Sequence, residues 1–243
     1  IKHHAEGHNL YLSKQGTFLN AVPKMLFYNC ASMTVLTYKS EGSYFLKYLD
    51  KLSVAYNVNC DRNIEKEFKA KAKKRITFGE TEALKRINFT YSKQSKFGLC
   101  SKETKTVQSA LKNCRSRFLK GVPLENIMVT CAEINWRNPK AFKSNKLRLN
   151  GFSKGTGLGK VNWVANQTRG TNQYSHCSHL FYLYDKYPMP PITQWLGSPT
   201  KEVSDAYAVT ELIQWVWRCR IRKELQITWY RHACRMKRVK RAV

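Results

Sequence analysis

The chain has 243 residues, of which 42% are hydrophobic and 12% aromatic, so it is long and apolar enough for one large domain or two small ones. This composition excludes wholesale disorder. Lysine and arginine number 43 against 16 aspartate and glutamate, which gives a formal net charge of +27. Such an excess repels itself unless a polyanion offsets it, so nucleic acid is the expected partner. A solvated basic surface and an acidic membrane surface are the alternatives.

No run of about 18 apolar residues is present, so no membrane span is predicted. The chain begins with Ile1 and no signal segment follows, so we expect a piece of a longer protein. The eight cysteines form no C-x-x-C pair, and we expect reduced thiols. A zinc site needs four ligands in paired spacings, and neither the N-terminal histidines nor the 176–179 string His-Cys-Ser-His has them, so no metal is predicted.

The first half of the chain alternates between strand and helix patterns after a polar segment at 1–24. The β-branched run 33–38 predicts a buried strand, residues 41–52 an amphipathic helix, and residues 54–58 a second short strand. A helix with a cationic face is predicted over 62–75. Its last residues, Lys73, Lys74 and Arg75, are candidates for nucleic-acid contact, with simple solvation an equal alternative. Residues 76–100 give no firm prediction.

Ser101 is a good N-cap for a helix whose apolar stripe runs from Val107 to Phe118. The apolar run 127–131 predicts a central strand, because near-continuous apolar runs belong to strands covered on both faces. Residues 137–160 are basic and glycine-rich, which favours a loop or hairpin. Within them, 155–160 lacks the first glycine and the final Ser or Thr of a phosphate-binding loop, so a flexible loop is predicted.

The last third begins with a short apolar strand over 161–165. Residues 179–187 are predicted as a short aromatic helix that the following prolines end, and Asp205 as the N-cap of the next helix. An edge or final strand is predicted over 225–230, and a basic tail over 231–243. This alternation favours an α/β domain over 25–230 with a mostly parallel sheet flanked by helices, and with basic insertions around 60–100 and 137–160.

Two motifs near the end of this domain carry the functional hypothesis. The first is the loop Arg169-Gly170-Thr171-Asn172, which directly follows the apolar strand over 161–165. The second is the segment 214–222, which contains Gln214, Arg218 and Arg222. Such a loop and an arginine-bearing helix present amides and cations to a phosphate. The alternative without a functional role is an ordinary turn for the loop, and for the helix a solvated end whose cations complement the helix dipole.

These motifs resemble the second RecA-like domain of superfamily 2 helicases and translocases, including helicase-like proteins of phages and mobile elements. Residues 168–172, Thr-Arg-Gly-Thr-Asn, resemble the fifth motif of that family, with Asn172 where aspartate is common. Gln214 and Arg218 match the first two landmarks of its sixth motif. Its last arginine is expected at Ile221, and arginines flank that position. The pattern at 33–52 would fit the opening unit of that domain, which carries the fourth motif.

The resemblance implies a motor domain that uses ATP and Mg²⁺ only when a first RecA-like domain, in cis or in trans, supplies the phosphate loop. Arg218, together with Arg222 or Arg220, would act as arginine fingers, and Gln214 would hold the nucleotide or link it to the loop. Arg169, Gly170, Thr171 and Asn172 would contact the nucleic-acid backbone. The isolated chain would then be inactive, and the protein would work in the cytoplasm, at the nucleoid or in an infected host cell.

Two other functions stay open. A non-enzymatic basic protein that binds or packages nucleic acid would also explain the charge and the aromatic content. A nuclease that uses the histidines is the weakest hypothesis, because the 16 acidic residues form no paired carboxylate core for a metal.

Overall fold

The structure is a computed structural model that describes residues 10–14, 16–36, 40, 43–98, 100–136, 151–168, 170–197 and 200–231. Contacts divide the chain into two compact units. Unit 1 takes residues 1–60 and 187–210, and unit 2 takes residues 61–186 and 211–243. No helix in the described part of the chain is both long and apolar enough to cross a membrane.

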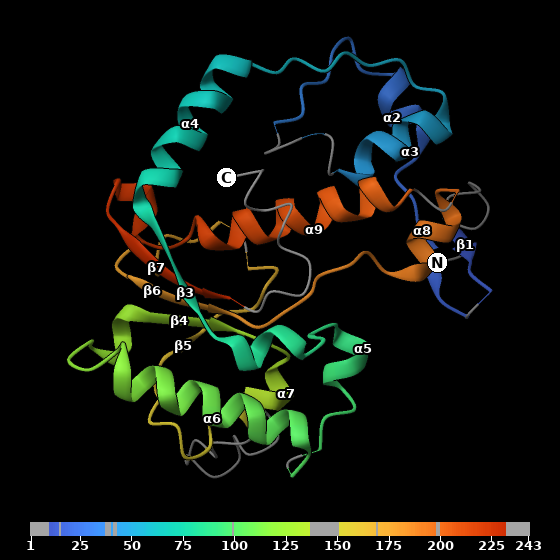
Figure 1. The fold of residues 1–243 in the computed structure, drawn as a ribbon. Coiled ribbons are helices and arrows are strands. Elements are labelled where there is room, and N and C mark those ends of the chain that lie inside the picture. Colours follow the sequence, from blue (N-terminus) through green and yellow to red (C-terminus); the bar gives the residue numbers. More distant parts are fainter. Residues whose placement is uncertain are drawn as a thin grey trace. The chain divides into compact units, whose positions relative to one another are not determined.

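Unit 2 is built on a five-stranded, fully parallel sheet with the order β3-β7-β6-β4-β5 (Figure 1). The strands are β3 (Ile76–Glu80), β4 (Ile127–Thr130), β5 (Asn162–Trp163), β6 (His179–Tyr182) and β7 (Ile227–Arg231). Ile76 pairs with Ile227, and His179 lies between Thr228 and Ile127. The predicted α/β fold with a mostly parallel sheet flanked by helices is therefore confirmed.

Helices cover both faces of this sheet because the strands bury side chains on both sides. α6 (Lys102–Arg117) covers one face, where Val129, Phe181 and Tyr230 join the main apolar cluster. The carboxyl half of α9 (Lys201–Val216) covers the other face, where its Trp215 packs edge-on against Tyr182 with ring centroids 5.3 Å apart. Figure 1 shows the two helices on opposite sides of the strands.

Local sequence signals explain how the helices of unit 2 begin. Ser101 caps α6, since its side chain accepts a hydrogen bond from the backbone N–H of Thr104. The predicted stripe of α6 is buried at Val107 and Leu111, whereas Phe118 lies past its end and is exposed. The other helical elements of unit 2 are α4 (Arg62–Arg75), η2 (Glu82–Arg86), α5 (Tyr91–Gln94), η3 (Leu124–Asn126), α7 (Glu133–Trp136), η5 (Gly151–Ser153) and η6 (Arg220–Lys223).

Unit 1 consists of short elements joined by long connections. β1 (Leu10–Leu12) and β2 (Phe18–Asn20) form an antiparallel hairpin. α3 (Tyr44–Leu52), capped by Ser43, confirms the helix predicted over 41–52. α2 (Lys24–Tyr28), α8 (Pro190–Trp195) and the amino half of α9 complete the unit. Trp195 packs against Tyr11 and Tyr48, with ring centroids 5.0 and 5.5 Å apart.

The structure corrects four predicted elements. The aromatic run 179–182 is strand β6 rather than a helix, because it pairs with strands on both sides and buries both of its faces. Asp205 does not cap the next helix, since α9 begins at Lys201 and Asp205 lies within it. The final strand predicted over 225–230 is confirmed as β7, which lies between β3 and β6 in the sheet. Residues 54–58 form no strand. Residues 33–36 form none either, and the rest of that prediction, 37–39, lies outside the described residues.

The region predicted as a flexible basic excursion is packed where the structure describes it. Phe152 and Leu158 are fully buried in the main apolar cluster on the α6 face. The Gln108 side chain donates a hydrogen bond of 2.5 Å to the Gly151 carbonyl. Six of the last ten residues of the predicted 137–160 insertion are therefore buried, and residues 137–150 lie outside the described residues.

Candidate nucleic-acid interface

Parallel sheets commonly bind ligands at the carboxyl ends of neighbouring strands whose connections leave toward opposite faces. β4 and β6 are such a pair here, because β4 continues to α7 on the α6 side and β6 continues toward α9. Gln94 lies at the carboxyl ends of β4 and β6, on the α6 side of the sheet. Its fully buried side chain donates to the carbonyls of Phe89 (2.6 Å) and Leu183 (3.1 Å) and accepts from the N–H of Ala132 (2.9 Å). The protein's own amide thus closes the usual crevice.

The amino ends of the strands have a different character, because basic side chains gather there. α6 and α9 run antiparallel to the strands, so their carboxyl ends lie at the edge where the strands begin (Figure 1). α4 ends at the same edge because β3 follows it directly. The basic residues that precede the strands are Lys73, Lys74 and Arg75 before β3, Arg117 and Lys120 before β4, Lys160 before β5, and Arg220, Arg222 and Lys223 before β7. We call these nine residues the basic edge.

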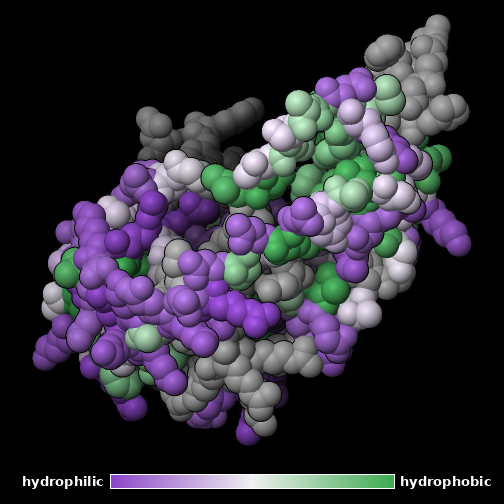
Figure 2. Space-filling view, turned by 90° about the horizontal axis from the view of Figure 1, so that it is seen from above, coloured by the Kyte–Doolittle hydropathy of each residue, from purple (hydrophilic) through white to green (hydrophobic). Residues whose placement is uncertain are grey.

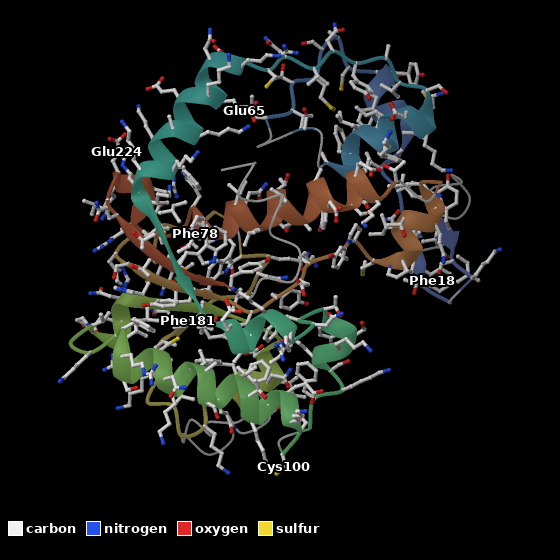
Figure 3. All side chains as sticks on the ribbon, in the orientation of Figure 1. Phe18, Glu65, Phe78, Cys100, Phe181 and Glu224 are labelled. Carbon is white, nitrogen blue, oxygen red and sulfur yellow. The ribbon has the colours of Figure 1, made fainter. Side chains whose placement is uncertain are left out.

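The end of α4 supplies the first part of the basic edge. Lys73 and Lys74 are exposed, and Arg75 is half-buried one residue before β3 begins. The Arg75 guanidinium forms an ion pair of 2.8 Å with the Glu224 carboxylate (labelled in Figure 3). This pair joins the end of α4 to the turn that leads into β7. The predicted contact residues of α4 are thereby placed beside the arginine-rich segment.

The two sequence motifs meet at the same edge. A guanidinium N–H of Arg222, in η6, donates a hydrogen bond to the side-chain oxygen of Asn172 in the Arg-Gly loop, 50 residues earlier in the chain. Gly170 has a φ of +68°, a conformation that favours glycine, and it is exposed. The Thr171 hydroxyl accepts from the N–H of Gln173 and shapes the next turn. Arg169 lies outside the described residues.

A network of backbone hydrogen bonds holds the loop and η6 in place. The N–H of Arg220 donates to the carbonyl of Cys177 (3.1 Å), and the N–H of Thr228 donates to that of Ser178 (2.9 Å). The N–H of Ser178 donates in turn to Asn126, just before β4. Because backbone hydrogen bonds join the segments that precede β4, β6 and β7, the backbone that carries the exposed cations is held in place.

Gln214 and Arg218 are not part of this exposed surface. Arg218 follows the end of α9 and is only 8% exposed, and Gln214 is half-buried. Trp215, between them, is fully buried and donates to the carbonyl of Val164. The structure therefore separates the predicted sixth motif into a buried part, at the end of α9, and an exposed part at Arg222.

Burial shifts the pKa values of one histidine and two cysteines beside the basic edge, in each case toward the uncharged form. The pKa of His179 is lowered by burial and by the positive charge of Arg220. Burial raises the pKa of the Cys177 thiol to about 11 and that of Cys219 to about 12. At neutral pH the two thiols are uncharged, so they add nothing to the field of the arginines, the lysines and Glu224 at this edge.

Sequence reasoning missed several members of the basic edge, namely Arg117, Lys120, Lys160 and Lys223. The sequence does contain a signal for them, since each lies at the end of a helix or in the turn that precedes an apolar strand. Among the described residues, no group of three His, Cys, Asp or Glu side chains could hold a metal ion. The seven cysteines in the described part of the chain are free thiols.

The parallel sheet and its covering helices define a Rossmann-like α/β domain. Residues 70–241 match the family described as the YonV C-terminal Rossmann-like domain, and the chain belongs to that family. It is similar to the SPbeta prophage-derived uncharacterized protein YonV of Bacillus subtilis (strain 168), at 26% identity over 257 aligned residues. The alignment covers 98% of this chain and 58% of the relative, so the chain spans little more than half of that protein's length. No solved structure matches the chain significantly.

Proposed function

We propose that this Rossmann-like domain is the second motor domain of a phage-type, nucleic-acid-dependent ATPase, and that the basic edge is its phosphate-binding surface. The observation that carries the proposal is the hydrogen bond between Arg222 and Asn172. The resemblance to superfamily 2 helicases assigns these two residues to motifs that cooperate, and they are in contact here although 50 residues separate them. The protein would act in the cytoplasm of a cell that carries or is infected by the phage.

The basic edge suits a polyphosphate for electrostatic reasons. Its acidic neighbours are few, since Glu125 and Glu224 are the carboxylates closest in sequence, and Glu224 is held by Arg75. The two terminal nitrogens of Arg222 give its planar guanidinium several donors, and the bond to Asn172 uses one of them. The remaining donors match phosphate oxygens in a fork geometry that lysine cannot supply.

Buried Arg218 suits a supporting role better than direct contact with phosphate in the conformation seen here. In the proposal, Arg222 is the arginine that reaches a nucleotide phosphate, while Arg218 and Gln214 hold the end of α9 against the sheet. ATP and Mg²⁺ would be bound chiefly by a first RecA-like domain, because the described part of this chain has no acidic metal cluster. We accordingly expect the isolated chain to release no phosphate from ATP.

Nucleic-acid binding by the basic edge can be measured by fluorescence anisotropy of a labelled oligonucleotide over a range of salt concentrations. Each lost phosphate contact should weaken binding and reduce the slope of log K against log salt by about 0.7–0.9. The test variant is Lys73→Ala with Lys74→Ala. Its matched control is Lys102→Ala with Lys105→Ala, which removes the same charge from exposed positions at the opposite end of α6.

We expect the test pair to lower both affinity and slope, and the control pair to change little. Equal losses of affinity in both pairs would mean that binding depends on the overall charge of the chain and not on the basic edge. Binding that does not change with salt concentration would exclude nucleic acid as the partner. The motor assignment has its own probe, Arg222→Lys in a longer protein that hydrolyses ATP. The point charge of lysine does not replace the planar fork of the guanidinium, so ATP turnover should fall by about 10³-fold relative to the unaltered protein. Normal turnover would contradict the assignment.

The alternative, a non-enzymatic nucleic-acid-binding protein, is favoured by the same basic edge but does not need the contact between Arg222 and Asn172. ATP turnover in the presence of nucleic acid, measured with and without Asn172→Ala in the longer protein, separates the two. A passive binding protein would keep its affinity after this change, because the asparagine side chain supplies no charge. In a motor, the loss of coupling would lower nucleic-acid-stimulated turnover while binding persists.

A further inference from the structure

Unit 1 buries very few of its own apolar side chains. Of its described hydrophobic residues, Tyr48 and Leu49 are the two that are buried, at 7% and 6% exposure. A domain is stabilised chiefly by apolar surface removed from water, and small units have little to spare. Unit 1 therefore lacks the core that would make it stable on its own.

The apolar side chains that unit 1 does not bury are at its surface. On α2, Met25 is 62% exposed and Leu26 is 50% exposed, while Leu36, in the irregular segment 33–36, is 93% exposed. The other large hydrophobic residues exposed in unit 1 are Tyr11, Leu12, Phe18, Val22, Tyr28, Met33, Val35, Tyr56, Val58 and Met189. On the face that Figure 2 shows, hydrophobic residues gather mainly in one region, beside a large region of hydrophilic residues.

So much exposed apolar surface marks an interaction site, and its chemistry indicates protein rather than nucleic acid. Many of the exposed side chains are aliphatic, and these cannot stack on bases as aromatic rings do. The described charges of unit 1 are also nearly balanced. The lysines are Lys14, Lys24, Lys47, Lys51 and Lys201, and the acids are Asp50, Glu202 and Asp205. The excess of cations that would attract phosphate belongs to unit 2.

The segment 33–36 adds a second indication. Its sequence, Met-Thr-Val-Leu, has a strand former in Val35 and predicts a buried strand, yet it forms neither strand nor helix and is exposed. Apolar side chains and backbone groups that favour a strand are thus presented to solvent. A segment of this kind gains most when another protein surface covers it.

We propose that the apolar surface of unit 1, centred on Met25, Leu26 and Leu36, is a docking site for the part of a YonV-type protein that this chain does not match. The relative is longer than this chain, which covers 58% of it, so a substantial remainder exists in that protein to act as the occupant. The occupant presents an apolar surface of its own and buries that of unit 1. This inference does not rest on the proposed motor function.

The test uses the portion of the Bacillus relative outside the aligned region, produced as a separate protein and mixed with this chain. We expect a 1:1 complex by calorimetry and by light scattering on a sizing column. It should persist after nuclease treatment and at about 0.5 M salt, where surface electrostatics are screened. No complex at about 100 μM of each protein would overturn the proposal.

Substitutions locate the site. Met25→Asp with Leu26→Asp should weaken the complex at least about tenfold, and Leu36→Asp, in a segment without packing to lose, should do the same independently. The matched controls are Phe118→Asp and Leu225→Asp in unit 2, which are 59% and 49% exposed and should leave affinity unchanged. Equal weakening by the controls would overturn the proposal. So would a dimer of this chain that the unit 1 variants dissociate, because the occupant would then be a second copy.

Discussion

Gln94 should be the most sensitive polar side chain of unit 2. It is fully buried, and its three hydrogen bonds satisfy the carbonyls of Phe89 and Leu183 and the N–H of Ala132. In Gln94→Ala these backbone groups lose their partner inside the protein. Each unpaired buried group costs about 1–3 kcal/mol, and some relief comes from water that enters the space. We therefore expect the free energy of unfolding to fall by about 3–5 kcal/mol.

Urea denaturation followed by circular dichroism measures this loss, and Gln94→Glu sharpens the test. An ionised carboxylate cannot donate, and it would face two carbonyl oxygens, so at neutral pH this variant should be no more stable than the alanine variant. Burial would raise the pKa of the new carboxyl, so the folded state would bind a proton more readily than the unfolded state. Stability should therefore recover as the pH falls. A loss below about 1 kcal/mol in both variants would refute the role assigned to Gln94.

Two further predictions concern the core and the sheet. In Gly79→Ala the new methyl carbon would lie 2.3 Å from the ring of Tyr230, which is buried. The overpacking should cost about 1–3 kcal/mol in urea denaturation, and an unchanged midpoint would show that the ring moves freely. His179 has a lowered pKa because of burial and Arg220, so the unfolded state binds its proton more readily. Thermal stability should fall as the pH drops below about 6.5, and His179→Gln should flatten that dependence; an equally steep dependence in the variant would exclude His179 as its source.

The sequence alone determined the elements whose local signals agree with their surroundings. The helix that Ser101 caps was predicted with its apolar stripe, because capping and helical spacing act within a few residues. The central strand 127–130 was predicted because it is apolar at every position, as a strand covered on both faces must be. The same reasoning misassigned 179–182, since a short aromatic run fits either a buried strand or a buried helix.

Tertiary structure decided where the functional residues lie. Sequence spacing could identify Asn172 and Arg222 as members of two motifs, but their contact depends on β6 and β7 being neighbours in the sheet. It could not show that Arg218 is buried while Arg222 is exposed, because both are arginines near one helix end. The helices α6 and α9, which run antiparallel to the parallel strands, end at one edge of the sheet, and α4 ends there directly before β3. Basic residues scattered over 150 positions of sequence become one surface for that reason, and only the order of the strands reveals it.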